Sequence, residues 1–276
     1  MERAHELASQ LTGLDRLPPG SWTDLSSERG RASGIVGGGR HPERVLNAVL
    51  DLVLPQVCAG CGATGARCCG GCLAELTAAP ARRLPEPVPV GLPDCWSAAR
   101  YEGAVRRAVV AYKERGAVAL AGVLAQVLTF TVLTAIGAGA FGTTAFGAAA
   151  RPFAVVPVPS GRLSRRARGH DPVGRLAVLV VRHLRAYGLR AELWTALVQA
   201  RRVADQAGLS SAERGANLAG SLRVPRAAKG PPAARVLLLD DIVTTGATLV
   251  EAARALRSAG VAAPLAVTVA ATRRRS

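Results

Sequence analysis

The sequence predicts an α/β protein in which helices flank a parallel β-sheet, with a small cysteine-rich module placed before it. Four consecutive aliphatic residues at 236–239 indicate a strand buried on both faces, and a helical pattern follows shortly afterwards. A second aliphatic run at 153–158 also precedes a helical pattern, at 172–187. Five of the six cysteines fall between residues 58 and 72. Strands that alternate with helices are typical of parallel sheets, and clustered cysteines are typical of a metal-binding module.

The composition permits a large core but leaves the type of partner open. The chain has 276 residues, 49% of them hydrophobic, which suits one large domain or two smaller ones. The net charge of +16 is carried almost entirely by arginine, since lysine occurs only at Lys113 and Lys229. This charge suits phosphate ligands or nucleic acid, but a GC-rich coding sequence would also favour arginine and alanine. The charge alone therefore does not establish DNA binding.

Residues 1–41 are predicted to be a disordered extension, because Gly, Ser, Pro and charged residues dominate and no period is sustained. No secretory signal is recognisable in them, and we expect a cytoplasmic protein. Folded sequence is expected from Pro42, where apolar residues at helical spacing predict a helix over 45–53. This helix, the cysteine module and a linker would form a first unit over 42–92, and residues 93–276 would form the α/β domain.

The cysteine-rich module consists of two C-x-x-C knuckles. Each knuckle offers two thiolates that can bind one side of a tetrahedral ion, so we predict a structural Zn²⁺ site with the ligands Cys58, Cys61, Cys69 and Cys72. Cys68 is an alternative to Cys69. A disulfide or redox role, or a degenerate knuckle without metal, also stays open, because the gap between the knuckles is short for a zinc ribbon. Cys95 stands alone and is expected to be a small buried apolar residue.

The segment after the cysteines is expected to pass from a linker into helices. Residues 78–93 are rich in proline and predict the linker. Apolar residues then recur at helical spacing and predict an amphipathic helix that ends near residues 113–116; they are Val105, Ala108, Val109 and Tyr112.

Residues 117–150 carry no charged side chain. The part around 118–136 is nearly long enough to cross a bilayer. However, Gln126, the Thr and Gly interruptions and the lack of an aromatic belt favour a helix packed beneath the sheet at 117–134. Membrane insertion is kept as the rival interpretation. Residues 137–150 predict a flexible, low-complexity insertion.

The sheet is expected to begin with a strand at 153–159, and a basic loop separates it from the helix at 172–187. Arginine pairs well with phosphate oxygens, so this loop could receive a pyrophosphate, although a solvated run of charges would look the same. His170 has no neighbour in sequence that would activate it as a general base. The loop contains Arg162, Arg165, Arg166, Arg168, Gly169 and His170.

The remaining elements are a second strand at 190–199 and a last strand at 265–271. Between them, residues 201–224 are polar and charged. Their length suits a mobile cover over an active site, and equally an exposed helix and loop.

The most informative stretch joins the strand at 236–239 to the helix after it. This stretch has the features of a phosphate-binding arrangement. They are the free amides of a first helical turn, several hydroxyl groups, and a glycine that lets the backbone approach the anion closely. The acids would accept hydrogen bonds from ribose hydroxyls or orient a hydrated Mg²⁺, so the stretch predicts a site for a phosphorylated sugar. An ordinary capped turn needs one such residue. Here the chain supplies Asp240, Asp241, Thr244, Thr245, Gly246 and Thr248.

This stretch resembles the signature with which type I phosphoribosyltransferases bind phosphoribosyl pyrophosphate (PRPP). The order of motifs along the chain resembles the ComF/GntX family, phosphoribosyltransferase-like proteins with an N-terminal zinc module. The motifs are the two knuckles, Tyr-x-Gly-x-Val-Arg with a downstream Lys, Val-Pro-Val-Pro, Arg-Gly, Gln-x-Gly-Leu with Arg-x-x-Asn, and the acid pair. The chain departs from the family pattern at two places that concern substrate handling. His170-Asp171-Pro172 stands where the family usually has an aromatic residue followed by Asn-Gln, and Val203 stands where a Thr is common.

The resemblance implies a type I phosphoribosyltransferase-like sheet that binds PRPP with Mg²⁺ and presents it to an acceptor of unknown identity. It implies catalytic roles for Asp240 and Asp241, and it makes Arg168 the candidate that neutralises the leaving pyrophosphate. PRPP would contact Asp240, Asp241, Ile242, Val243, Thr244, Thr245, Gly246, Ala247 and Thr248. Further contacts with the cover or the pyrophosphate would come from Lys113, Gly169, Gln206 and Arg214.

Three hypotheses about function follow. The first is a Mg²⁺-dependent phosphoribosyltransferase. The second is a module that handles single-stranded DNA without turnover, since some ComF proteins are linked to natural competence. The third, a membrane-tethered PRPP sensor, is the least favoured. A homodimer is a candidate assembly.

Overall fold

The computed structural model describes residues 56–140, 152–159, 171–201, 211–228, 230–233 and 235–272. The described residues from Val57 onward belong to one compact unit. The predicted extension at 1–41, the helix predicted at 45–53, the basic loop at 160–170 and most of the predicted insertion at 137–150 lie outside the described residues.

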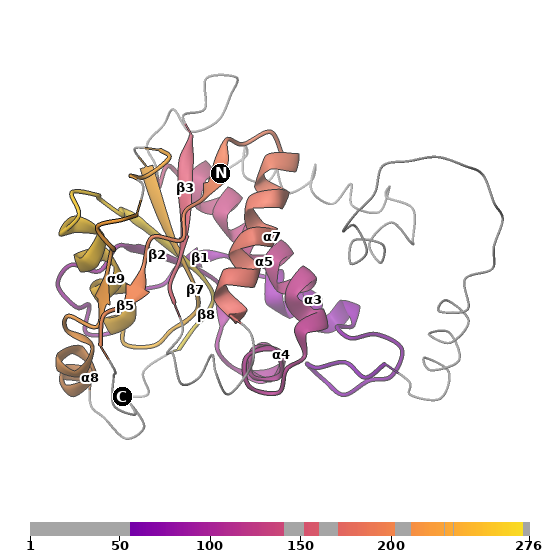
Figure 1. Ribbon diagram of the computed structural model, residues 1–276. Helices are drawn as coiled ribbons and strands as arrows, with labels where there is room; N and C mark the ends of the chain where they lie inside the picture. Colours follow the sequence, from indigo (N-terminus) through magenta and orange to yellow (C-terminus); the bar gives the residue numbers. More distant parts are fainter. Residues whose placement is uncertain are drawn as a thin grey trace. The chain divides into compact units, whose positions relative to one another are not determined.

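A six-stranded sheet in the order β1-β2-β8-β7-β3-β4 forms the centre of this unit (Figure 1). All neighbouring strands are parallel except β1 and β2, so the predicted parallel sheet is confirmed. The strand predicted to begin the sheet is not its first strand, because β1 and β2 precede it in the chain. The strands are β1 Ala81–Arg82, β2 Asp94–Arg100, β3 Phe153–Pro157, β4 Ala191–Leu193, β7 Arg235–Val243 and β8 Leu265–Ala271.

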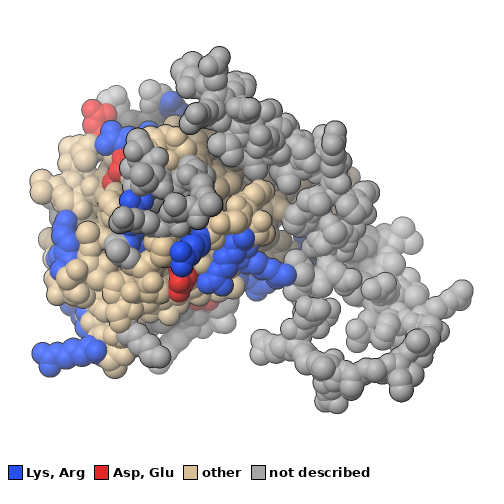
Figure 2. Space-filling view, turned by 90° about the horizontal axis from the view of Figure 1, so that it is seen from above, with Lys and Arg blue, Asp and Glu red and all other residues tan. Residues whose placement is uncertain are grey.

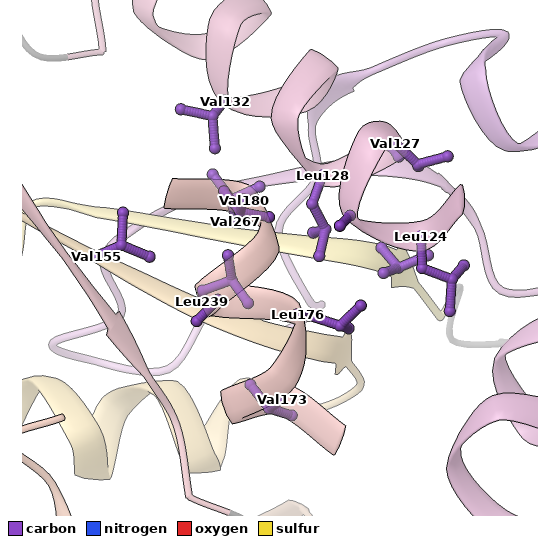
Figure 3. Close-up of a cluster of buried hydrophobic side chains, with 14 of the residues drawn as sticks. Leu124, Val127, Leu128, Val132, Val155, Val173, Leu176, Val180, Leu239 and Val267 are labelled. Atoms are coloured by element: carbon purple, nitrogen blue, oxygen red, sulfur yellow. The ribbon is translucent and has the colours of Figure 1, made fainter. Parts of the chain in front are cut away.

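One face of the sheet is covered by helices, three of which the sequence predicted. They are α4 (Gly103–Glu114), α5 (Ala121–Gly137, after the short 3₁₀ turn Val118–Leu120) and α7 (Pro172–Ala186), with α3 (Gly70–Thr77) beside them. In the core, side chains of three strands meet the helices: Val155, Leu239 and Val267 lie toward Leu128 and Leu176 (Figure 3). Each such fully buried side chain stabilises the fold by roughly 1.5–3 kcal/mol.

The helix α5 decides between the two interpretations of the uncharged stretch. The segment Val118–Gly137 has a length and hydropathy that would allow it to cross a membrane, but 61% of its most apolar window is buried inside the protein. It packs on α7 and on the sheet. The predicted helix beneath the sheet is therefore present, and the packing explains why it carries no charge.

The opposite face carries α9 (Ala247–Arg257) and a small antiparallel pair, β5 (Val198–Gln199) with β6 (Leu222–Arg223). Strand β7 serves both faces, because alternate residues point to opposite sides: Leu237 belongs to the first core, and Val236 and Leu238 belong to the second. The single strand predicted at 190–199 is wrong, since β4 and β5 lie in different sheets. The helix α8 (Ser211–Leu218) lies between β5 and β6 in the chain.

The proline-rich segment is not a free linker, so this prediction is wrong. β1 within it pairs with β2, and Leu84 and Leu92 pack against the second core. Proline had suggested a spacer, but its lack of an N–H is tolerated where the chain runs along an edge strand and over a helix.

Candidate functional site

Two adjacent aspartates end the buried part of β7. Asp240 and Asp241 are both buried, and the amide of Asp241 donates a hydrogen bond of 2.8 Å to Oδ1 of Asp240. Asp241 also meets Lys113 of α4, whose Nζ lies 3.1 Å from Oδ1 and 2.7 Å from Oδ2. Lys113 was expected to contact pyrophosphate or the cover. The structure places it against the acid pair instead.

The charges in this cluster perturb one another. Burial, and then the neighbouring charge of Asp241, raise the pKa of Asp240 to about 8. Burial would lower the pKa of Lys113, but the charges of Asp241 and Asp240 outweigh it and raise that pKa. In this buried site Lys113 thus compensates the charge of Asp241, while Asp240 holds its proton more tightly than a free aspartate does.

The loop after β7 leads directly into α9. Gly246 occupies the left-handed region at φ 77° as the N-cap of the helix. The hydroxyl of Thr245 accepts a 3.4 Å hydrogen bond from the amide of Ala247, Thr244 is exposed, and Thr248 is half-buried. The first amides of a helix have no carbonyl one turn earlier to bind, and the helix dipole adds positive potential there. Strand end, acid pair and helix N-terminus are therefore adjacent, as predicted.

The four cysteines of the two knuckles converge in space. Their sulfur atoms all lie within 4.8 Å of one another, and the cluster consists of Cys58, Cys61, Cys69 and Cys72. Thiolates bound to one tetrahedral Zn²⁺ at about 2.3 Å lie roughly 3.8 Å apart, so the spacing fits a zinc ion. All six cysteines are free, which does not favour the disulfide interpretation. Cys68 is not a member of the cluster.

The electrostatics of the cluster also suit a cation. Burial would raise the pKa of Cys58, but hydrogen bonds from the backbone of Cys69, Cys61 and Gly60 lower it to about 6. Among them, the amide of Cys69 lies 3.3 Å from the Cys58 sulfur. By contrast, burial and then the charge of Cys58 raise the pKa of Cys68 to about 11. The backbone around Cys58 therefore favours the thiolate form of this side chain, which is the form that binds a metal ion.

Comparison with known proteins finds two partial similarities. Residues 175–276 match the family model of the phosphoribosyl transferase domain. Competence protein F of Haemophilus influenzae is 31% identical over 110 residues, which are 40% of this chain and 46% of that protein. The chain thus contains a region that matches the phosphoribosyl transferase domain, and over 40% of its length it is similar to Competence protein F. The match covers about half the length of this curated relative.

The region that matches the phosphoribosyl transferase domain contains only part of the site. The acid pair and the loop Thr244–Thr248 fall inside it, whereas Lys113 and the four cysteines precede it. A residue that precedes the matched region therefore contacts Asp241 inside it. Nothing in the spacing of Lys113 indicated this partner, because 128 residues separate the two.

Several predicted site residues are not placed. Arg168, Gly169, His170 and Gln206 lie outside the described residues, and Arg214 belongs to α8 without a described side chain. The first described residue after the basic loop, Asp171, caps α7 by accepting a 3.1 Å hydrogen bond from the amide of Gly174. Asp171 belongs to the segment that departs from the ComF/GntX pattern, and its role here is to cap a helix.

The base of the polar stretch 201–224 is anchored, which sequence reasoning missed. Buried Glu251 of α9 accepts a 2.9 Å hydrogen bond from the amide of Leu222 in β6. Arg254 binds both this carboxylate and, at 3.0 Å, the carbonyl of Leu222. Arg201 donates to the carbonyls of Asn217 and Ala219 at 2.7 and 2.8 Å. A Glu-Arg pair at helical spacing of three was the available signal.

Basic side chains are also frequent among the described residues on one face of the protein. On the face in Figure 2, Lys and Arg are more frequent than Asp and Glu among the described residues. This agrees with a net charge of +16 and favours anionic ligands in general.

Proposed function

We propose that this protein binds PRPP with Mg²⁺ and transfers its phosphoribosyl group to a nitrogen nucleophile. The observation that carries the proposal is the junction of β7 and α9, where a buried acid pair precedes a helix N-terminus in a phosphoribosyl transferase domain. A sugar phosphate combines an anionic end with hydroxyl groups, and the junction offers a partner for each.

The phosphate end is assigned to the loop Thr244–Thr248. The amides of the first turn of α9 and the hydroxyls of Thr244, Thr245 and Thr248 would donate to the 5′-phosphate of PRPP. Thr244 is already exposed, so the loop is accessible to a ligand.

The ribose is assigned to the acid pair. Asp240 and Asp241 would accept hydrogen bonds from its hydroxyls, and Lys113 would keep Asp241 in place while limiting the repulsion between the two acids. In a displacement at C1 of the ribose, these residues position the sugar, and Arg168 is our candidate for neutralising the pyrophosphate that leaves.

The acid pair also fits a hydrated Mg²⁺. Oδ2 of Asp241 is buried and has no hydrogen-bond partner among the described residues beyond its ion pair with Lys113. Carboxylate oxygens of this kind hold the water shell of Mg²⁺. When bound, the ion would neutralise charge on the pyrophosphate. Asp240 and Asp241 would orient its waters.

Calorimetric titration tests the proposal. Wild-type protein is titrated with PRPP in the presence and absence of MgCl₂, and Asp241→Asn is titrated in parallel. We expect Mg²⁺-dependent binding that weakens more than about tenfold in the variant, because the neutral amide loses a charge-assisted acceptor. An absence of heat at millimolar PRPP would refute the proposal.

Turnover is tested separately by pyrophosphate release from PRPP with single nucleobases as acceptors. Ribose 5-phosphate serves as the matched ligand without a leaving group, and it should bind without releasing pyrophosphate. PRPP binding without turnover for any base would reduce the proposal to a PRPP-binding protein.

A second candidate is handling of single-stranded DNA during uptake. The net charge of +16 and the name of the matched relative, Competence protein F, favour it. Binding of a labelled oligonucleotide should then weaken steeply and linearly with the logarithm of salt concentration. Weak binding with little salt dependence would argue against this role.

A further inference from the structure

The segment that we had predicted to be a linker lies against the proposed phosphate loop. We call residues 84–92 the proline strap. Pro85 is buried, Pro89 and Leu92 are half-buried, and the amide of Leu92 donates a 3.2 Å hydrogen bond to the carbonyl of Pro89. The strap follows β1 and precedes β2, so both of its ends are attached to the sheet.

Its closest approach is to Gly246. A β-carbon placed on Gly246 would lie 2.9 Å from Cδ1 of Leu92, 3.2 Å from Cγ of Pro85 and 3.3 Å from Cγ of Pro89. These three side chains therefore surround the side of Gly246 on which any other residue would carry its side chain. Gly246 is buried, whereas Thr244 two residues earlier is exposed.

The glycine is thus required for two reasons, and neither is contact with phosphate. Its φ of 77° is costly for residues with a β-carbon, and the strap occupies the space of that β-carbon. The strap also reaches the far end of the same helix, because a β-carbon on Gly91 would lie 3.1 Å from a guanidinium nitrogen of Arg257. The strap therefore contacts the N-cap of α9 and the side chain of its last residue, Arg257.

We infer that the proline strap is a positioning element for the phosphate loop: Leu92, Pro85 and Pro89 hold Gly246 in its left-handed conformation and so keep the amides of the first turn of α9 aimed at a phosphate. This inference rests on the proposed function, since it concerns the same loop. Leu92, Pro85 and Pro89 are positioning residues and do not themselves contact the ligand.

The physical reason is preorganisation. A glycine left unsupported samples many backbone conformations, and a ligand that needs one of them loses affinity in proportion to its population. Proline has little conformational entropy to lose, so a strap built on proline restrains the loop at a low entropic cost.

The test compares two residues of the same strap. Leu92→Ala removes the closest contact with Gly246, whereas Val90→Ala changes a side chain that is 97% exposed. PRPP binding with Mg²⁺ is measured by calorimetry, and amide hydrogen exchange is measured over residues 243–250. We expect Leu92→Ala to raise the Kd about tenfold and to speed exchange in this segment, and we expect Val90→Ala to leave both within about twofold.

Two further variants separate positioning from general destabilisation. Leu92→Met keeps the apolar bulk and should restore affinity to within about twofold of wild type. If Leu92→Ala does not fold, Pro89→Gly loosens the strap at a less buried residue and is measured in its place. Unchanged PRPP affinity and unchanged exchange in the loop for the folded strap variant would overturn the inference.

The failure of the proposed function would look different. If wild-type protein does not bind PRPP, the assignment of the ligand fails, and exchange in residues 243–250 still decides whether the strap holds the loop. If wild-type protein binds PRPP and Leu92→Ala binds it equally well with equal loop exchange, only the role of the strap is refuted.

Discussion

At the residue scale, the contact between Lys113 and Asp241 is the feature with the clearest energetic consequence. The Asp241 side chain is 4% exposed and the Lys113 side chain 30% exposed, so the ion pair is buried on one side only. Removing one partner of a buried pair leaves the other charge without compensation, and this usually costs more than the pair itself contributes.

Lys113→Met should therefore lower the free energy of unfolding by roughly 2 kcal/mol, less than the loss for a fully buried pair because Lys113 retains contact with water. Urea denaturation measures this change. The double variant Lys113→Met/Asp241→Asn is the control, and it should recover part of the lost stability. If the single variant is as stable as wild type, the pair has no role in the fold.

Asp240 makes the stability depend on pH. Its pKa is raised by burial and by Asp241 to about 8 in the folded protein, from 3.8 for the free group. The folded state therefore holds this proton more tightly than the unfolded state. The contribution of Asp240 is fully present below about pH 4 and is lost as the pH rises towards 8.

Asp240→Asn has no proton to lose, so the difference in unfolding free energy between the variant and wild type should shift in favour of the variant between pH 4 and pH 8. Denaturation curves at several pH values measure the difference directly. A difference that is independent of pH would show that Asp240 titrates alike in both states.

At the element scale, α4 links the cysteine cluster to the acid pair. Ala104, in its first turn, packs against Cys58 and Cys72, and the Arg107 guanidinium donates a hydrogen bond to the carbonyl of Gly60. Lys113, near the other end of the helix, reaches Asp241. The cysteine cluster and the acid pair therefore contact the same helix.

Treatment with a chelator, or the substitution Cys58→Ser, should release one zinc ion per chain. Hydrogen exchange should then become faster over residues 57–72 and the first turns of α4, because the ion no longer holds the two knuckles together. Elemental analysis and exchange mass spectrometry measure the two effects. Cys68→Ser is the matched control and should keep its zinc. Wild-type protein purified without zinc would contradict the prediction.

The helix α9 begins at the proposed phosphate loop and also contacts the β5–β6 pair, through Glu251. Burial would raise the pKa of Glu251, but the hydrogen bonds from Arg254 and the amide of Leu222 lower it, so the carboxylate stays charged. Truncation of Glu251 would leave the amide of Leu222 and the guanidinium of Arg254 without this acceptor.

Glu251→Ala should therefore destabilise the protein by about 2 kcal/mol and expose residues 201–222 to limited proteolysis. Glu251→Gln keeps one acceptor oxygen and should show a smaller loss. Equal proteolysis of wild type and Glu251→Ala would mean that Leu222 is held by the β5–β6 pairing alone.

At the scale of the whole molecule, the packing of α5 against both the sheet and α7 explains why this helix carries no charged side chain. A helix that packs on both the sheet and α7 needs an apolar surface over most of its circumference. Its composition therefore approaches that of a membrane span. We predict that expressed protein stays in the supernatant after high-speed centrifugation of a lysate, and recovery with the membrane pellet after a salt wash would contradict this. Cytoplasmic location stays a prediction.

The elements that were predicted well are those with a strong local period. The helices α4, α7 and α9 show an apolar surface at helical spacing, and β8 matches the predicted strand at 265–271. The helix α5 was predicted from its uncharged, apolar composition instead. β2 was missed because Asp94–Arg100 is rich in small residues of low strand propensity, and it is stabilised by its pairing with β8. The strand predicted at 190–199 was split because β4 and β5 join different neighbours.

The sequence by itself determined the chemistry of the β7–α9 junction, because strand, acids, hydroxyls and glycine are contiguous and each acts through local geometry. It also determined the pair of cysteine knuckles. Only the tertiary structure decided that Cys69 and not Cys68 completes the cluster, that Lys113 is the partner of Asp241, and that a proline-rich segment packs on Gly246. These contacts join residues that are not neighbours along the helix or strand period. They depend on how the sheet brings distant segments together, which no local pattern encodes.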